Sequence, residues 1–380
     1  ELHGAASPTA ALARLLEAQS CGTLARRLGA APVEVGDLQE FVTRGRGGRG
    51  VIIVLPLPNG AHVFLFDEEG ALHAKRLSRS SLAGMTPGLR DLMQSRERGD
   101  KASAVLKKHA VTVTNQLLGE AFVRRVGTWE SVFFVGIDRV TDLPPTLLLD
   151  EHGGWLGCSK VVSEWPSVVV GLVMANRQKP ENMAIRSLVD PLVGKGDRPN
   201  ALDFYDDERG RLEAACGGAN HALFGRDAAF SRLTAGEASL LYVHCHGELA
   251  VGARRPGMLL LADDSPTTAE MIESKFAGRS GPAVVLLAAC RAGWNRTYLG
   301  EDGSGGLTAA FIVAGSRSVV APRRDVFHNP TKAMCLDIVS ALASGEVSIG
   351  EALRQHRLKM VEAGHDPRDS TGLRLYGAVD

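Results

Sequence analysis

Strand-like and helix-like segments alternate from about residue 131 to the C-terminus, and this alternation restricts the chain to few folds. The candidate strands are short, apolar and rich in β-branched residues, which is typical of strands buried on both faces. They are Ser131 to Ile137, Lys160 to Ser163, Ile185 to Val189, Ser239 to His244, Ala283 to Ala289 and Ser316 to Ala321. The pattern predicts an α/β fold with a mostly parallel sheet flanked by helices.

Helices are predicted between and after these strands. The candidates are Asp206 to Ala215, Thr268 to Phe276, Gly306 to Val313, Pro330 to Ala343 and Ile349 to Ala363. Asn329 before Pro330 is typical of an N-cap and first helical position, and Ser348 with Glu351 has the pattern of a capping box. Val168 to Ala175 fits two structures, because its β-branched residues favour a strand whereas its length and its Trp165-Pro166-Ser167 entry favour a helix.

The chain before residue 127 has a different character. Spaced apolar residues predict short amphipathic helices in 1–42, and Arg44 to Gly50 predicts a flexible linker, although arginine-glycine runs also occur in nucleic-acid binding segments. Val51 to Leu55, Ala61 to Phe66 and Leu72 to Arg76 predict a β-meander, and residues 80–125 are mostly helical in pattern. We therefore expect an N-terminal helical segment with a linker (1–50), a β-meander and helical region (51–126) and an α/β domain (127–380).

Charge and cysteine content limit the class of protein. Lys plus Arg total 43 and Asp plus Glu total 43, which argues against a polyanion binder, so nucleic acid is not an expected partner. No apolar run approaches the roughly 20 residues that span a bilayer, and no signal-peptide pattern is present. We expect a soluble, cytoplasmic protein, and the opening Glu1 suggests a trimmed or excised fragment.

Reduced thiols are expected because the cysteines are scattered, without metal-ligand spacing or the density of a disulfide scaffold. They are Cys21, Cys158, Cys216, Cys245, Cys290 and Cys335.

Two segments place reactive groups at the ends of predicted strands. His246-Gly247 follows the run Leu240 to Cys245, and Cys290 follows the run Ala283 to Ala289, 44 residues after His246. Open α/β sheets place their chemistry at the carboxyl ends of strands. A thiol needs a nearby base or cation to become a thiolate at neutral pH, and a histidine distant in sequence commonly supplies it. The pair predicts a cysteine peptidase whose oxyanion hole is formed by the N–H groups of Gly247 and Cys290.

Two short motifs suggest other chemistries. His244 and His246 lie on one face of a strand and are candidate zinc ligands, but a third ligand at metal spacing is missing nearby. Gly194-Lys195-Gly196 lacks the rest of the phosphate-loop pattern, so nucleotide binding is not expected. The predicted peptidase chemistry requires no metal and no organic cofactor.

Several motifs then occur in a fixed order. They are Ile185 to Asp190 followed by Asp206-Asp-Glu208, Tyr242-Val-His-Cys-His246-Gly247, Val285-Leu-Leu-Ala-Ala-Cys290-Arg-Ala-Gly293, Gly305 to Pro322, and the closing Leu375-Tyr-Gly377. Together, from about residue 50 to the C-terminus, the chain resembles the CHAT-domain family of caspase-like cysteine peptidases. The resemblance implies a caspase-like fold for residues 127–380, a His246–Cys290 dyad and an oxyanion hole that includes Gly247.

Substrate specificity is less constrained than the dyad. Ala288 stands two positions before Cys290, where related arginine- and lysine-specific enzymes carry an acid and caspases carry glutamine, and Pro322 to Asp325 replaces a tryptophan-containing stretch of the family. A charged P1 side chain that enters a cleft must meet an opposite charge. The candidates are Glu301, Asp302 and Asp325 for a basic residue and Arg323 or Arg324 for an acidic one, and the more numerous acids favour a basic P1. The loop from Arg291 to Gly306 is the expected moving part.

The sequence thus predicts a cysteine endopeptidase that cleaves a limited set of protein substrates. The resemblance implies control by an upstream sensor or activator protein, and it suggests a gasdermin-like pore-forming protein in bacterial defence as a substrate. One alternative stays open, namely a catalytically silent caspase-like module that binds a partner and no longer cuts.

Overall fold

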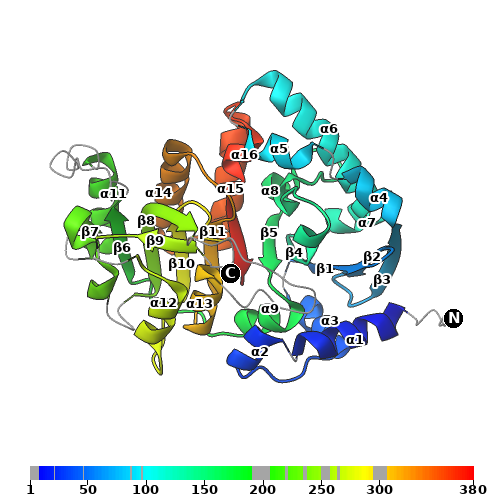
Figure 1. Ribbon diagram of the computed structural model, residues 1–380, viewed down its shortest axis with the longest axis horizontal. Coiled ribbons are helices and arrows are strands. Elements are labelled where there is room, and N and C mark those ends of the chain that lie inside the picture. Colours follow the sequence, from blue (N-terminus) through cyan, green and yellow to red (C-terminus); the bar gives the residue numbers. More distant parts are fainter. Residues whose placement is uncertain are drawn as a thin grey trace. The chain divides into compact units, whose positions relative to one another are not determined.

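The structure is a computed structural model that describes residues 8–20, 22–45, 47–85, 88–95, 97–190, 206–218, 221–233, 238–249, 257–262, 266–293 and 306–380. These residues form two compact units (Figure 1). The first unit contains the described residues up to Val173 together with Asp366–Thr371. The second contains the described residues from Met174 to His365 and Gly372–Asp380.

The first unit is built on strands in the order β3-β2-β1-β4-β5. The three N-terminal strands pair antiparallel, which confirms the predicted meander, whereas β4 runs parallel to β1 and β5 parallel to β4. Every residue of β4 is buried, because helices and loops cover both of its faces. The strands are β1 (Arg49–Leu57), β2 (Gly60–Phe66), β3 (Leu72–Ser78), β4 (Ser131–Val135) and β5 (Val161–Trp165).

Helices pack around this sheet, and those within 8–43 and 79–127 lie where the sequence predicted helical structure. The apolar core joins strand residues such as Ile52 and Phe134 to helix residues such as Leu106 and Val113. The helices are α1 (Pro8–Ser20), α2 (Thr23–Arg27), α3 (Val35–Thr43), α4 (Arg79–Met85), α5 (Leu89–Gln94), α6 (Asp100–Leu117), α7 (Gly119–Gly127), α8 (Leu156–Ser159), α9 (Val168–Ala175) and α16 (Pro367–Ser370), with single 3-10 turns at Ile137–Arg139 and Pro145–Leu147.

Two local expectations in this unit are settled by backbone contacts. Val168–Ala175 is a helix, and the Ser167 hydroxyl accepts a hydrogen bond from the Val170 N–H (3.2 Å) at its start. The expected flexible linker ends in ordered structure, since Arg49 and Gly50 already belong to β1. Gly47 and Gly48 make the turn before it with φ of 84° and 74°, a conformation that favours glycine.

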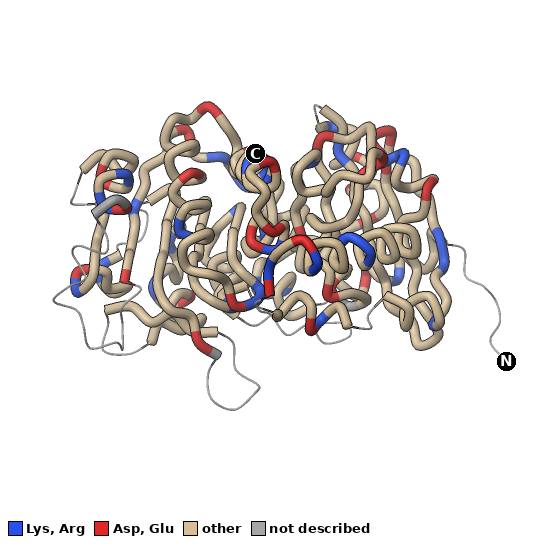
Figure 2. Tube along the Cα trace, turned by 90° about the horizontal axis from the view of Figure 1, so that it is seen from above, with Lys and Arg blue, Asp and Glu red and all other residues tan. Residues whose placement is uncertain are grey.

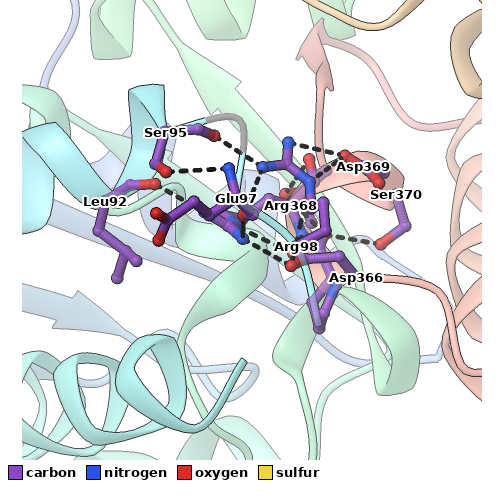
Figure 3. A network of polar contacts seen from close by, with 10 residues as sticks. Leu92, Ser95, Glu97, Arg98, Asp366, Arg368, Asp369 and Ser370 are labelled. Carbon is purple, nitrogen blue, oxygen red and sulfur yellow. Dashed lines mark hydrogen bonds and ion pairs between the residues drawn. The ribbon is translucent and has the colours of Figure 1, made fainter. Parts of the chain in front are cut away.

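Helix α16 belongs to the first unit although it lies close to the C-terminus (Figure 3). Its Arg368 side chain is 2% exposed. The guanidinium donates to the carbonyl oxygens of Leu92 (2.7 Å) and Glu97 (2.6 Å) and to the Asp366 carboxylate. Arg98 adds an ion pair to Asp369 at 2.9 Å. The segment between α5 and α6 is therefore fastened to α16 by buried, charge-assisted hydrogen bonds.

The second unit is built on strands in the order β12-β11-β10-β8-β6-β7. All neighbours in this order are parallel except β12, which is antiparallel to β11, and β9 pairs antiparallel with the far end of β8. The mostly parallel sheet agrees with the predicted fold class and contains four of the six predicted strands. The other two, Ser131 to Ile137 and Lys160 to Ser163, correspond to β4 and β5 of the first unit. The strands are β6 (Ile185–Asp190), β7 (Ala222–Phe224), β8 (Leu240–Leu249), β9 (Gly257–Leu260), β10 (Val284–Ala288), β11 (Ser318–Pro322) and β12 (Leu373–Gly377).

Helices of the second unit form two groups. In one group α14 packs against both α11 and α15, and in the other α12 packs against α13 (Figure 1). They are α11 (Asp206–Cys216), α12 (Ala269–Phe276), α13 (Leu307–Val313), α14 (His328–Ser344) and α15 (Ile349–Glu362), with 3-10 turns at Gly225–Asp227 and Phe230–Arg232.

One predicted helix start is confirmed and one is wrong. The Ser348 hydroxyl accepts from the Glu351 N–H at 3.2 Å and caps α15 as predicted. Helix α14, however, begins at His328 with Phe327 as its N-cap, so Asn329 lies inside the first turn and is not the cap. His328 is held by a tertiary contact to His244, which extends the helix before the Asn329-Pro330 signal.

Charges of both signs are distributed along the described parts of the trace (Figure 2), in keeping with the equal totals of basic and acidic residues in the sequence. Among the described helices, none has the length and apolar character that crossing a membrane requires.

Candidate active site

The candidate site lies in the second unit, where β8 and β10 run side by side (Figure 1). Their parallel pairing ends with Ala288 opposite His244. Two residues further along, His246 and Cys290 reach the same level at the carboxyl ends of the two strands. There β8 leaves the parallel sheet, and His246 pairs instead with Leu260 of β9. The strand is thus longer than predicted and passes through the site before it ends.

Gly247 shows how closely the two segments approach. A Cβ atom on this residue would lie 2.0 Å from the carbonyl oxygen of Cys290 and 3.0 Å from its nitrogen. Real Cβ atoms do not approach backbone atoms so closely, so only glycine fits here. The backbone that directly follows His246 is therefore in contact with the backbone of Cys290.

The residues after Cys290 are hydrogen-bonded to the last residue of β11 and to the segment that follows it. Arg291 has φ of 59° and is the sole non-glycine residue with positive φ in the described chain. Its N–H donates to the Arg324 carbonyl oxygen at 3.1 Å, and the Gly293 N–H donates to that of Pro322 at 2.8 Å. The strained Arg291 conformation turns the chain sharply behind the thiol, as strained residues often do at functional sites.

Cys290 is partly buried, and its Sγ lies 3.8 Å from the carbonyl oxygen of Val326. Burial raises the pKa of the thiol above its ordinary value. The Asp325 carboxylate adds to the rise in pKa, whereas backbone hydrogen bonding at Val326 and the Arg291 guanidinium oppose it. The site described here therefore favours a protonated thiol.

A buried chain of polar side chains lies on the face of β8 that carries His246. Oε1 of Glu208, in α11, accepts from the Tyr242 hydroxyl (3.0 Å) and lies 2.9 Å from Nδ1 of His244. Nε2 of His244 lies 3.3 Å from Nδ1 of His328, and the two rings stack with centroids 4.9 Å apart. Burial and the neighbouring His244 lower the pKa of His328 to about 4, and His246 contributes to the same lowering. His328 is therefore neutral at neutral pH.

Glu208 and His328 were not identified as site residues from the sequence. Glu208 belongs to the Asp206-Asp-Glu208 motif at a predicted helix start, and His328 directly precedes the Asn329-Pro330 signal. Their partners lie 36 and 84 residues away, so no local pattern could have grouped them.

The predicted specificity residues fall into two sets. Asp325 is 61% exposed and pairs with Arg291 at 2.6 Å, at the edge of the candidate site. Arg324 is partly buried and its carbonyl oxygen holds the Arg291 N–H. Glu301 and Asp302, with most of the loop from Arg291 to Gly306, lie outside the described residues.

The zinc alternative can be compared with the geometry. Both ring nitrogens of His244 lie at hydrogen-bond distance from other side chains, Glu208 and His328. Within the described parts of the chain, no group of three or more His, Cys, Asp or Glu side chains is arranged to hold a metal ion.

A mostly parallel α/β sheet with these two segments at its carboxyl end defines the class of caspase-like cysteine protease folds. The family model of the CHAT domain matches residues 107–372, more than half of the chain. The chain belongs to the CHAT domain family. No sequence of a curated protein matches it significantly.

Two crystal structures of one complex agree with this fold. The separase–securin complex of Saccharomyces cerevisiae is similar in two crystal structures, with TM-scores of 0.56 and 0.57 and 10% identity in each. The match covers 90% of this chain but only 30% and 31% of the separase chain, so this chain spans about a third of its length. The arginine-specific cysteine proteinase gingipain R matches with a TM-score of 0.41 and 10% identity, over 77% of this chain and 69% of that one.

Proposed function

We propose that this protein is a cysteine endopeptidase in which Cys290 is the nucleophile and His246 the general base. The observation that carries the proposal is the contact between Gly247 and the Cys290 backbone, which brings the His246 segment against the thiol-bearing residue at the end of a parallel sheet. The CHAT family and the caspase-like fold support the same activity.

The chemistry is acyl transfer. The Cys290 thiol gives its proton to His246, and its sulfur attacks the scissile carbonyl carbon, forming an S–C bond. The backbone N–H groups of Gly247 and Cys290 hold the oxyanion. The C–N bond then breaks as His246 returns the proton to the leaving amine, and water hydrolyses the thioester. Because burial raises the thiol pKa, transfer of the proton to His246 is the step that makes the nucleophile.

The dyad is tested by substitution. We expect Cys290→Ala and His246→Ala each to abolish peptide hydrolysis, and the double variant to be no worse than either single one, because the two groups act as a unit. His244→Ala should be milder than His246→Ala, and hydrolysis should persist in a strong chelator. Hydrolysis is followed on a peptide library by mass spectrometry, with circular dichroism as the control for folding. Full activity in Cys290→Ala would exclude the proposal.

A silent binding module is the second candidate function, and the raised pKa of Cys290 favours it. A thiol-reactive peptidyl electrophile separates the two functions. A catalytic Cys290 is labelled much faster than the buried thiol of Cys335, whereas a silent module shows no such preference. Labelling sites are read by mass spectrometry of the digested protein.

For specificity we propose a basic P1 residue that is bound by Asp325. The Arg291–Asp325 ion pair is 42% and 61% exposed, and exposed pairs contribute about 0–1 kcal/mol. An arginine of the substrate can therefore replace Arg291 at little cost. Asp302 remains the other candidate acid.

The specificity proposal predicts a selective loss. Asp325→Ala should lower kcat/KM for arginine substrates about tenfold or more, a change of about 1.4 kcal/mol. Labelling of Cys290 by a small thiol reagent should not slow, because the Asp325 carboxylate raises the pKa of the thiol and its removal favours the thiolate. Asp302→Ala is measured alongside it, and Asp227→Ala, which removes another exposed ion pair of this unit, is the control. Cleavage mapped mainly after Asp or after apolar residues would contradict a basic P1 and leave the dyad untouched.

The proposed substrates are a few protein targets, among them a gasdermin-like pore-forming protein in bacterial defence, under the control of a sensor or activator protein. The gasdermin-like substrate follows from the family resemblance. The similarity to separase, which was crystallised with securin, supports control by a protein regulator. The five described cysteines are free thiols, which favours a reducing compartment such as the cytoplasm. Incubation with a purified gasdermin-like protein, with Cys290→Ala as the control, tests the substrate.

A further inference from the structure

Glu208, His244 and His328 form a polar chain beside the proposed dyad, in which Glu208 and His244 are buried and His328 is partly buried. The Glu208 side chain is fully buried and that of His244 is 4% exposed. Burying a carboxylate and an imidazole costs free energy that apolar side chains of similar volume would avoid. The acyl-transfer steps use none of these three side chains. Because polar side chains are costly at these positions, we expect them to serve a function that apolar side chains could not.

Two side chains meet one oxygen at the Glu208 end of the chain. Oε1 of Glu208 accepts a hydrogen bond from the Tyr242 hydroxyl at 3.0 Å and lies 2.9 Å from Nδ1 of His244. Nε2 of His244 then shares one proton with Nδ1 of His328 across 3.3 Å. Because the two rings also stack, neither ring can turn without losing a contact. Glu208 thus fixes the orientation of His328 through His244.

The same chain reaches both members of the proposed dyad. His244 lies two residues before His246 in β8, and the alternation of side chains puts both histidines on one face. His328 lies two residues after Val326, whose carbonyl oxygen contacts the Cys290 thiol. A displacement of His328 would therefore move Val326 relative to Cys290 and release the strand that carries His246.

We propose that Glu208, His244 and His328 are positioning residues for the His246–Cys290 pair. They hold the end of β8 and the Asp325–His328 segment at the separation that proton transfer from Cys290 requires. The inference rests on the proposed peptidase function and deepens it. The three side chains act through the dyad and touch no substrate, so their loss lowers kcat and leaves KM nearly unchanged.

Variants at His328 test the proposal most directly. His328→Ala removes the contact to His244, and we expect kcat to fall about tenfold or more, because small displacements of catalytic groups have effects of this size or larger. KM should change less than about twofold. His328→Asn places an amide at the Nδ1 position that can donate or accept, so it should recover kcat to within about threefold of the parent protein. Glu208→Gln, which keeps an acceptor oxygen, should also be milder than His328→Ala.

The matched control is His356→Ala. His356 is buried like His244 and pairs through Nδ1 with Asp337 at 3.0 Å in the same unit. Its loss should lower the unfolding temperature and leave kcat unchanged. If His356→Ala lowers kcat as much as His328→Ala does, or if His328→Asn is as poor as His328→Ala, the positioning role is overturned.

A second measurement separates this inference from the peptidase proposal. The rate of Cys290 alkylation by iodoacetamide, read by mass spectrometry, requires no substrate and reports on thiolate formation. We expect alkylation to slow in His328→Ala and to be restored in His328→Asn, with His356→Ala unchanged. Equal alkylation rates in all three variants would reject the positioning role. Hydrolysis that persists in Cys290→Ala would instead reject the peptidase proposal while leaving the alkylation result to stand.

Discussion

Gly247 is the residue at which a single added carbon should disturb the proposed site most directly. A Cβ there meets backbone of Cys290 at 2.0 Å rather than the end of a flexible side chain, so the two strands must separate. We expect Gly247→Ala to lower hydrolysis about a hundredfold, the effect of an approximately 1 Å misplacement of catalytic groups, and to lower the unfolding temperature. Peptide hydrolysis and thermal unfolding measure the two effects.

Gly36→Ala is the control for this substitution. Gly36 lies in α3, where an added Cβ has nothing within 4 Å, and alanine in a helix is favoured over glycine by about 0.5–1 kcal/mol. Activity should be unchanged and stability equal or higher. An active, fully stable Gly247→Ala variant would show that the β8–β10 approach has no part in catalysis.

At this scale the sequence predicted where the proposed dyad lies but not what supports it. His246-Gly247 and Cys290 follow apolar runs that form neighbouring parallel strands, so a topological rule was sufficient to bring them together. Glu208 and His328 meet His244 only after α11 and α14 have packed on the sheet. Nothing in the local sequence of either residue records that packing. The catalytic roles of His246 and Cys290 stay predictions.

Helix α16 is held by buried polar contacts of Arg368. Replacing Arg368 by Ala removes the bidentate partner of the buried Asp366 carboxylate (Figure 3). The Leu92 carbonyl loses its Arg368 donor, whereas the Glu97 carbonyl still accepts from Arg98 at 3.1 Å. Breaking a buried pair in this way costs about 3–5 kcal/mol. We expect Arg368→Ala to lower the stability of the first unit by this order, measured as a shift in the urea unfolding midpoint.

Arg90→Ala is the control, because it removes an arginine ion pair that is exposed rather than buried. Arg90 is 71% exposed and pairs with Asp142 at 3.2 Å in the same unit, and exposed pairs contribute about 0–1 kcal/mol. Equal effects of the two substitutions would show that α16 contributes no more than a surface ion pair.

The sequence predicted those elements whose apolar residues recur with a clear period. It failed where tertiary contacts determine whether an element forms or where it begins. The buried strands and the α15 cap were predicted because each has a local signal. Helix α14 starts earlier than its local signal because His328 is held from outside the helix. Strand β9 was not predicted, since its four residues form a strand only by pairing with the end of β8.

At the scale of the whole molecule, groups with shifted pKa values are concentrated in the second unit. Burial raises the pKa of Cys216 to about 11 and also raises the pKa values of Cys245, Cys335 and Tyr242. Burial lowers the pKa of His328 to about 4 and also lowers that of His356. As the pH rises, the thiols of the folded unit lose their protons at a higher pH than those of the unfolded chain. As the pH falls, its histidines are protonated at a lower pH than those of the unfolded chain.

These shifts predict a stability maximum for the second unit between about pH 6.5 and 8.5, the ordinary pKa values of histidine and cysteine. As the pH rises above that window, the unfolded thiols ionise first and stability falls. As the pH drops below it toward 4, the unfolded histidines are protonated first, and stability falls again.

Hydrogen exchange of β8 and β10 peptides in dilute urea at pH 5, 7.5 and 9.5, corrected for the intrinsic exchange rate, measures the stability of the second unit. The His328→Asn, His356→Asn double variant should lose the decline between pH 6.5 and 5 and keep the alkaline one. Protection that is constant from pH 5 to 9.5, or an acid decline that survives the double variant, would contradict the assignment.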